Sequence, residues 1–450
     1  MGQPTVVATS TGLAFAALEY LAAAGLVTYV AGDSAWIPIV VAAGLAVVAY
    51  GFFGELNGMY PTAAAIRLYM RHAMDDRAAL TITFTYMTTI VLVIASDAFI
   101  VGSALAHAFG EAPWECAFWI AGLLSLAVGA NLRGVVVAGA LESAATAFVV
   151  LATVVIASLA IAHSGHALRS PFEPLHHHSV GDFAESVALG VFLFSAFEWV
   201  TTSAEEVRRP EFVPRGMLMA IGILCVVCAL ATVAMSHTLD HGQLSSSYPQ
   251  LYLGVKAVGH SGLWVMTAVT AVTAVNTFNG GFITASRFIY GTAREGSLPR
   301  GLARLNDRAV PWVPVVVLGL ASLLVALIVA VSHGWQVLVA VGAALEAMIY
   351  AVAAYCVLRL RSRHAGTFRP FRIRGARCIG VLGMVVFTLL ALTAALSVDN
   401  RFDPLPLGII AVGALLSGFY VVRVLPRVQA REEARRAATP RRRPPRAGSS

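Results

Sequence analysis

The sequence has few charged residues. Asp, Glu, Lys and Arg together make up only 12% of its 450 residues, whereas 58% are hydrophobic. Average soluble domains carry about twice this charged fraction. The mean hydropathy of +0.77 therefore comes from many long apolar stretches. This composition excludes a water-soluble globule and indicates a protein that lies in a lipid bilayer.

Lysine and cysteine are scarce too. Lys256 is the single lysine, and the five cysteines provide no disulfide framework. Cys225 and Cys228 form a CxxC pair inside an apolar run, on one face of a helix, so we interpret them as packing residues. The N-terminus lacks the basic region of a cleavable signal peptide, and the first apolar run is typical of a spanning helix.

Motifs of ATP-driven and hydrolytic chemistry are missing. The sequence contains no Walker loop, no HExxH and no GxSxG. We therefore expect that ATP does not drive the protein, that it is not an enzyme and that it needs no cofactor. We assign a cluster of histidines to a surface loop and predict no metal site there: His163, His166, His176, His177 and His178.

Twelve apolar stretches are long enough to be membrane-spanning helices, since the hydrocarbon core needs roughly 20 residues per helix. The sequence predicts an all-α integral membrane protein with spans near residues 12–31, 36–56, 80–107, 117–132, 137–162, 183–203, 217–237, 263–290, 312–332, 335–358, 378–398 and 404–424.

The placement of arginine predicts the orientation of these spans. Every even-numbered gap between spans contains arginine, and seven lie between Arg359 and Arg377 alone. The odd-numbered gaps contain only Arg169, Lys256 and Arg401. Because basic loops stay in the cytoplasm, both termini are expected there, in a multi-pass protein of the inner membrane. The net charge of +7 is thus explained without nucleic acid.

The C-terminal segment, residues 429–450, has no apolar face and is rich in Arg and Pro. We predict a disordered basic cytoplasmic tail after a transporter domain of residues 1–428. Attraction to anionic lipid headgroups and a tail without a specific role both remain open.

Four stretches, taken in order, carry a family resemblance: GELNGMYPTAAAIRLYMRHAM at 54–74, NLRGVVVAG at 131–139, FSAFEWVTTSAEEVRRPEFVPRGM at 194–217, and VNTFNGGFITASRFIYGTAREGSLPRGLARLN at 275–306. Together they resemble the amino acid–polyamine–organocation superfamily of secondary transporters. The resemblance implies the leucine-transporter fold, in which two inverted five-helix repeats precede two extra helices. The repeats would cover about 12–162 and 183–358, and the extra helices about 378–424.

The sequence departs from the family pattern at two glycines and one lysine. The glycine-rich break of helix one corresponds to Ala23, Ala24, Gly25 and Leu26, and the usual glycine of helix six is Ala196. Val149 stands where some proton-coupled relatives carry a lysine, so that coupling device is absent.

The resemblance implies a substrate cradle at the breaks of helices one and six. Helix termini suit a carboxylate, and a buried acid suits an ammonium group. The candidate substrate-binding residues are Ala23, Ala24, Gly25, Leu26, Asp97, Phe194, Ser195, Ala196, Phe197, Glu198, Asn276 and Asn279. Phe194, Phe197 or Trp199 could form an occluding lid.

Acidic residues within spans are costly to insert, at about 2.5–3.5 kcal/mol each, so they are functional candidates by default. Glu198, Glu346 and Glu19 are candidates for coupling, and Glu142 is a weaker one because it lies near the cytoplasmic end of its span. A second group could close an inner gate through ion pairs, or form only a solvated interfacial cluster: Glu55, Glu205, Glu206, Arg208, Arg209, Arg287 and Arg294.

We therefore predict a secondary permease that moves amino acids or related small amines across the cytoplasmic membrane by alternating access. Proton coupling, sodium coupling and plain exchange all stay open. One alternative is a membrane amino-acid sensor that signals through its cytoplasmic face. Another is an integral membrane enzyme, although the sequence shows no interfacial catalytic cluster.

Overall fold

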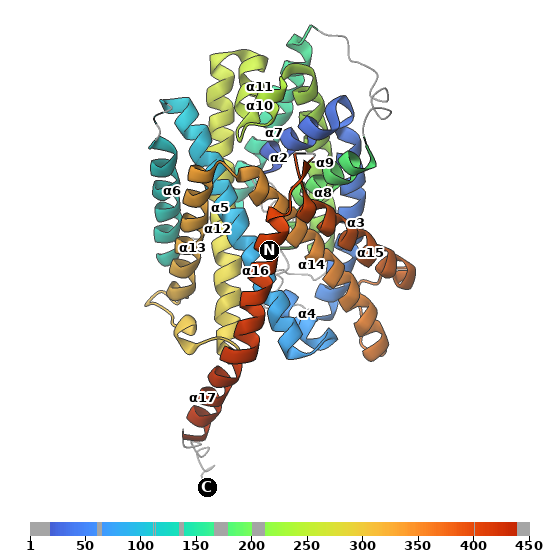
Figure 1. Ribbon diagram of the computed structural model, residues 1–450, viewed down its shortest axis with the longest axis vertical. Coiled ribbons are helices and arrows are strands. Elements are labelled where there is room, and N and C mark those ends of the chain that lie inside the picture. Colours follow the sequence, from blue (N-terminus) through green and yellow to red (C-terminus); the bar gives the residue numbers. More distant parts are fainter. Residues whose placement is uncertain are drawn as a thin grey trace, which may run out of the picture.

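The computed structural model describes residues 19–60, 65–110, 112, 114–134, 139–165, 179–199, 212–399 and 401–438. Within them, eleven helices are long and apolar enough to span a bilayer. Figure 1 shows these helices running roughly side by side, with α4 and α17 at one end and α10 and α11 at the other. The expectation of an all-α membrane protein is confirmed.

The first half of the chain provides six helices: α2 (Glu19–Ala31), α3 (Trp36–Met59), α4 (Ala65–Ala73), α5 (Asp76–Phe109), α6 (Glu115–Leu132) and α7 (Gly139–His163). Apart from α4, these match the predicted spans. The sequence did not predict α4, because it is a nine-residue amphipathic helix in a connection between spans. Residues 12–18 of the first predicted span lie outside the described residues.

The second half contains α8 (Val180–Leu193), α9 (Phe212–Thr238), α10 (His241–Leu244), α11 (Pro249–Val258), α12 (His260–Arg294), α13 (Trp312–Ser332) and α14 (Trp335–Arg363). The short 3₁₀ helix η4 (Arg300–Ala303) follows α12. The last elements are α15 (Ala376–Leu396), the two-residue strands β1 (Ser397–Val398) and β2 (Arg401–Phe402), α16 (Leu405–Phe419), the π-helical η5 (Tyr420–Val424) and α17 (Leu425–Ala438). The strands are antiparallel, with Ser397 opposite Phe402.

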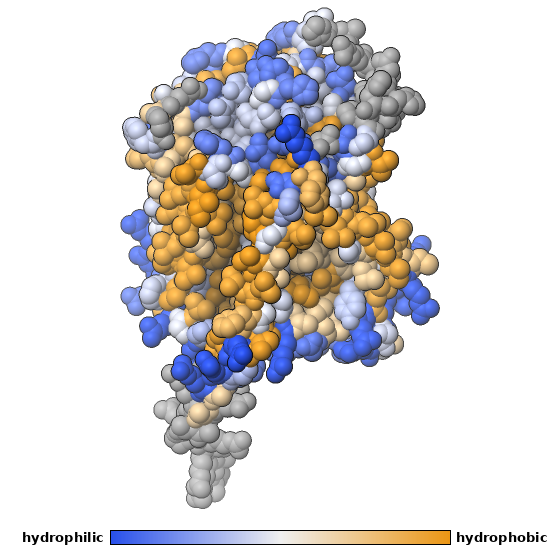
Figure 2. Space-filling model, viewed as in Figure 1, coloured by the Kyte–Doolittle hydropathy of each residue, from blue (hydrophilic) through white to orange (hydrophobic). Residues whose placement is uncertain are grey.

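The helices differ in how far neighbours cover them. The apolar windows of α5 and α14 are 89% and 83% buried, whereas those of α6 and α16 are 17% and 11% buried. The outer helices present side chains such as Leu126 and Leu415, which are 70% and 74% exposed. Figure 2 shows the result, a broad apolar band between two hydrophilic ends. Such a band matches the hydrocarbon layer of a membrane.

Small residues let some helices approach closely. At the crossing of α11 and α12, a Cβ on Gly262 would lie 1.8 Å from the Gly254 carbonyl oxygen. A side chain cannot fit there, so glycine is required on both helices. Small residues of this kind are typical of helix contacts inside membranes, where close packing supplies the attraction between helices.

The predicted break of helix one at residues 23–26 is wrong. Residues 19–31 form one continuous helix, α2, which agrees with its run of alanines, the strongest helix former. Gly25 has a different role: a Cβ there would lie 2.7 Å from Pro249 Cγ and 3.0 Å from the Leu244 carbonyl oxygen. The glycine allows α2 to pack against the segment of α10 and α11.

Two other expectations concern helix ends. The expected break of helix six is confirmed, because α8 ends at Leu193 and turns follow up to Trp199. The predicted disordered tail begins too early, since residues 429–438 belong to α17. This segment contains Gln, Ala, Arg and Glu, which are good helix formers, and it continues a helix that has already begun. Residues 439–450 lie outside the described part.

Candidate substrate and coupling site

The break after α8 is centred on Ala196. This residue has a φ of 66°, in the left-handed region, which costs a residue with a Cβ roughly 1–2 kcal/mol. The Trp199 N–H donates to the Ala196 carbonyl at 3.1 Å, which closes a short 3₁₀ turn. Alanine thus adopts the conformation for which the family's glycine is suited.

The residues of the break point polar groups into the protein interior. Phe194, Ser195, Phe197 and Glu198 are each at most 1% exposed. Among the described residues, neither carboxylate oxygen of Glu198 has a hydrogen bond of good geometry, and neither does the Ser195 hydroxyl. Since buried polar atoms are nearly always satisfied, unsatisfied ones gathered at one place mark a site that a ligand, water or ion completes.

Glu346 of α14 faces the same place. It is 1% exposed, and its carboxyl lies close enough to that of Glu198 for the two to interact directly. The hydroxyl of Tyr350, one turn further along α14, adjoins Glu346, and Tyr86 of α5 lies within electrostatic range of both acids. Two buried carboxylates side by side repel each other unless a proton or another cation lies between them.

Aromatic rings surround this acid pair. The ring of Tyr350 lies 5.8 Å from that of Phe53, 6.0 Å from Phe197 and 5.4 Å from Phe387. These centroid distances are typical of edge-to-face and tilted ring packing. The ring of Tyr350, whose hydroxyl adjoins Glu346, is thus packed among three phenylalanine rings next to the buried acid pair. Phe197 is thus part of an aromatic wall beside the acid pair.

Trp199 links the break to α5 and α12. A Cβ on Gly281 would lie 2.9 Å from Ile94 Cδ1 and 3.6 Å from the Trp199 ring, so these three residues adjoin. The helices α5 and α12 run antiparallel, so a step forward along α5 corresponds to a step back along α12. Asp97 follows Ile94 by one turn and is therefore level with the turn before Gly281. That turn contains Asn279, and Asn276 lies a further turn out.

The polar residues of this level differ in burial. Asp97 is fully buried, Asn276 is 9% exposed and Asn279 is half-buried. The three side chains thus lie at a similar depth on α5 and α12, near the level of the break. Of the predicted substrate-binding residues, Ala23, Ala24, Gly25 and Leu26 are buried in the continuous helix α2, which contacts α8.

Some predicted residues cannot be placed. Glu205, Glu206, Arg208 and Arg209 lie outside the described residues, as do the side chains of Glu19 and Glu142. Arg287 is exposed on α12, and Arg294 lies over the ring of Tyr290, 5.6 Å from its centroid.

Glu55 has ion-pair partners that the sequence did not suggest. At the end of α3 it is 1% exposed, and it accepts hydrogen bonds from Arg361 Nε at 2.7 Å and from the Ile373 N–H at 3.0 Å. Arg369 Nε lies 3.4 Å from the same carboxylate. Among the described residues, Glu55 thus attaches the connection between α14 and α15 to α3.

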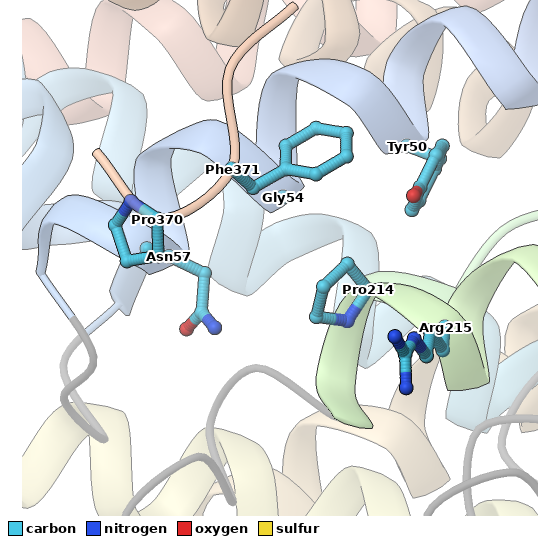
Figure 3. Close-up of a pocket in the computed structure, with 8 residues that line it drawn as sticks. Tyr50, Gly54, Asn57, Pro214, Arg215, Pro370 and Phe371 are labelled. Atoms are coloured by element: carbon cyan, nitrogen blue, oxygen red, sulfur yellow. The ribbon is translucent and has the colours of Figure 1, made fainter. Parts of the chain in front are cut away.

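This connection lies along a glycine face of α3. A Cβ on Gly51, Gly54 or Gly58 would lie 3.4, 3.2 and 3.3 Å from Ile373, Phe371 and Pro370 respectively. We call residues 369–373 the α3 strap. Figure 3 shows Phe371 over Gly54, with Tyr50 on one side and Pro214 of α9 below. The strap, α3 and α9 border a cavity of about 270 Å³ that also contains Asn57 and Arg215.

A second buried arginine connects distant segments at the same end of the protein. Arg67 of α4 is 2% exposed. It donates from Nε to Glu295 at 3.1 Å, and from Nη2 to Asp76 at 3.2 Å and Ser297 at 2.8 Å. The pairs join α4, the start of α5 and the end of α12. Sequence reasoning placed Arg67 among the orientation signals only, because its partners lie as far as 230 residues away.

Comparison with known proteins assigns the chain to a family. The amino acid permease family matches residues 7–424. The chain belongs to the amino acid permease family. This membership agrees with the expectation of a permease rather than an enzyme, and the relatives are named as amino acid permeases and transporters.

Individual relatives are distant. The amino acid permease YecA of Bacillus subtilis is 23% identical over 63% of this chain and 66% of its own length. The mouse Asc-type amino acid transporter 1 is 27% identical over 43% of this chain and 36% of its own. L-asparagine permease 1 of Mycobacterium tuberculosis is 25% identical over 54% and 51%. The chain therefore spans less than two thirds of the length of each of these relatives.

Solved structures show the same fold. A manganese transporter of Eremococcus coleocola superimposes with a TM-score of 0.61 over 95% of each chain, at 17% sequence identity. The permease thus has the expected leucine-transporter-like architecture, with two five-helix repeats followed by two more helices.

Proposed function

We propose that this permease moves amino acids or related small amines across the cytoplasmic membrane by alternating access, and that Glu198 and Glu346 couple this movement to protons. The observation that carries the proposal is the pair of buried carboxyls beside the helix-six break. The family and the relatives named above support the substrate class.

The acid pair supports a proton as the coupling ion. Three hydroxyl groups, those of Ser195, Tyr86 and Tyr350, are the other polar groups that we place beside it. A proton shared between two carboxyls removes their repulsion and leaves a site into which an ammonium group can enter when the proton departs. Val149 stands in place of the lysine of some proton-coupled relatives, so the acids would take over its task.

The substrate would bind at the level of the break. The ammonium group of an amino acid would face Glu198 and the carbonyl groups freed where α8 ends, while its carboxylate would meet backbone N–H groups in the turn that follows. Asp97, Asn276 and Asn279 lie at the same level on α5 and α12. The aromatic wall around Tyr350 would close over the substrate and keep water away.

The orientation proposed from arginine places α4, the α3 strap and α17 in the cytoplasm. The Glu55 and Arg67 ion pairs would then hold the cytoplasmic side closed, and the structure has them formed. Both chain termini would lie on this side of the inner membrane.

Ligand screening is the first test of the substrate. Purified protein in detergent is heated in the presence of a panel of amino acids and polyamines, and its melting temperature is recorded. A ligand at a hundredfold excess over its dissociation constant stabilises the native state by about 2.7 kcal/mol. A shift with one chemical class identifies the substrate class, whereas no shift with any compound contradicts the proposal.

Coupling is tested by uptake of that substrate into proteoliposomes. A pH gradient of one unit supports at most about tenfold accumulation for one proton, because a unit corresponds to about 1.4 kcal/mol. We expect the parent protein to accumulate substrate, and Glu198→Gln or Glu346→Gln to exchange substrate without accumulating it. Glu185→Gln, which changes a buried acid within α8, is the matched control. Accumulation that survives in both variants contradicts proton coupling through this pair.

A further inference from the structure

A basic groove lies where the last membrane helix leaves the apolar band. It is bordered by η4 and α17, encloses about 460 Å³, and is lined by Pro299, Arg300, Gly301, Val424, Arg427, Val428 and Arg431. Three of these seven lining residues are arginines, and none is acidic. The combination of three guanidinium groups with a partly apolar floor suits an anion that carries apolar chains.

Arg423 of η5 and Arg427 and Arg431 of α17 form a regular series. They follow one another at intervals of four residues, so Arg427 and Arg431 lie on one face of α17. Like charges at this spacing repel each other and destabilise a helix. A bound anion would remove this repulsion. The nearby acid Glu295 is already paired with Arg67 and Arg71.

The walls of the groove are fixed to the rest of the protein. The Tyr420 hydroxyl donates to the Ser297 carbonyl at 3.0 Å, which attaches η5 to the segment before η4. Val421 and Leu425 are buried and pack against Leu80 of α5. The groove therefore exists before any ligand arrives.

The depth of the groove corresponds to the headgroup layer. Phe419 and Val422, at the end of the apolar face of α16, are 63% and 64% exposed, as expected of lipid-facing side chains. Figure 2 shows hydrophilic side chains directly below this apolar column. With a rise of 1.5 Å per residue, Arg427 lies about 7 Å beyond Val422, and the headgroup layer on each side of a bilayer is about 5–8 Å thick.

We propose that this groove binds the phosphate group of an anionic phospholipid headgroup, with Arg427 and Arg431 as the main contacts. Arginine suits phosphate because its planar donors can bind two oxygens at once. Val424 and Val428 would contact the glycerol and the first methylenes of the chains. The site lies apart from the substrate path, so lipid composition would act on the stability of the transporter without changing its substrate.

The test compares lipids and variants. The full-length protein is placed in nanodiscs of phosphatidylcholine with increasing phosphatidylglycerol, and the lipid retained after extraction is measured by native mass spectrometry. Each arginine near an anionic surface contributes about 1 kcal/mol, which corresponds to about fivefold in affinity. The double variant Arg427→Gln/Arg431→Gln is therefore expected to retain phosphatidylglycerol about 25-fold less well.

A matched control has the same charge change at the same end of the protein. Arg372→Gln/Arg374→Gln removes two exposed arginines from the connection before α15 and should retain phosphatidylglycerol like the parent. Equal retention by all three proteins overturns the proposal, as does equal loss in both double variants, because the effect would then be net charge alone. A further arm adds inorganic phosphate. If millimolar phosphate displaces the lipid, the groove binds free phosphate, and its assignment to lipid is overturned.

Discussion

The Glu55 ion pairs make the strongest prediction about stability. Glu55→Gln keeps the shape of the side chain but removes its charge, which leaves Arg369 and Arg361, 6% and 22% exposed, without their counter-ion. Breaking a buried pair costs about 3–5 kcal/mol. Because Arg361 can reach water, we expect about 3 kcal/mol, at the low end of this range. The loss of stability should be confined to the α3 strap, which Glu55 holds against α3.

Hydrogen–deuterium exchange measures this local loss of stability directly. The Ile373 N–H donates to Glu55 in the folded protein, so its exchange reports the opening of the strap. A loss of about 3 kcal/mol corresponds to about a hundredfold faster exchange for peptides that cover residues 369–375, since 1.4 kcal/mol is a factor of about ten. Peptides of α13 should exchange as in the parent protein, because α13 lies away from the strap.

Two further variants separate the local effect from general damage. Glu185→Gln changes a buried acid that bonds to Ser397, and it should leave the strap peptides unchanged. In the double variant Glu55→Gln/Arg361→Gln, the increase in strap exchange should be smaller than the combined effects of the two single variants predict, because the two side chains interact with each other. Strap exchange within about twofold of the parent in Glu55→Gln would refute the reasoning, since the ion pairs would then contribute little energy.

Two predictions concern backbone packing, and both are measured as melting temperatures in detergent. Gly262→Ala places a methyl group against the Gly254 carbonyl, and overpacking of this kind costs about 1–3 kcal/mol. Gly44→Ala, in α3 with open space around it, is the control and should melt at or above the parent temperature; equal melting of the two variants would contradict the crossing of α11 and α12. Ala196→Gly should raise the melting temperature slightly, because relief of the left-handed backbone, about 1–2 kcal/mol, exceeds the entropic cost of glycine, about 0.4–1 kcal/mol. Ala196→Val should lower it, and a lower temperature for Ala196→Gly would show that the backbone there is unstrained.

The spans were predictable because the bilayer fixes their length and composition. The predicted range 312–332 coincides with α13, and most other spans extend a few residues beyond the expected ends. The missed helices α4, α10 and α11 lie in connections, where no bilayer thickness sets a minimum length. Their stability comes from packing on other helices, which the order of residues does not show.

Gly25 illustrates why the site was less predictable. A glycine can mark a flexible break or a close contact, and only the position of Pro249, 224 residues later, decides between them. At Ala196 the reverse holds, because a residue that favours a regular helix adopts the left-handed conformation in the break. The acids were easier to find, since any carboxyl inside a span is unusual. Their pairing, Glu198 with Glu346 and Glu55 with Arg361, depends on the fold.

The Arg67 contacts set a limit on how the protein can change shape. One guanidinium connects α4, the start of α5 and the end of α12, so these segments behave as one block as long as the bonds remain. A rotation that opens the protein must then take place at joints outside this block. The turn after α8 is such a joint, and there the methyl group of Ala196 restricts the backbone angles that a glycine would leave free. The turn is therefore confined to fewer backbone conformations than a glycine there would allow.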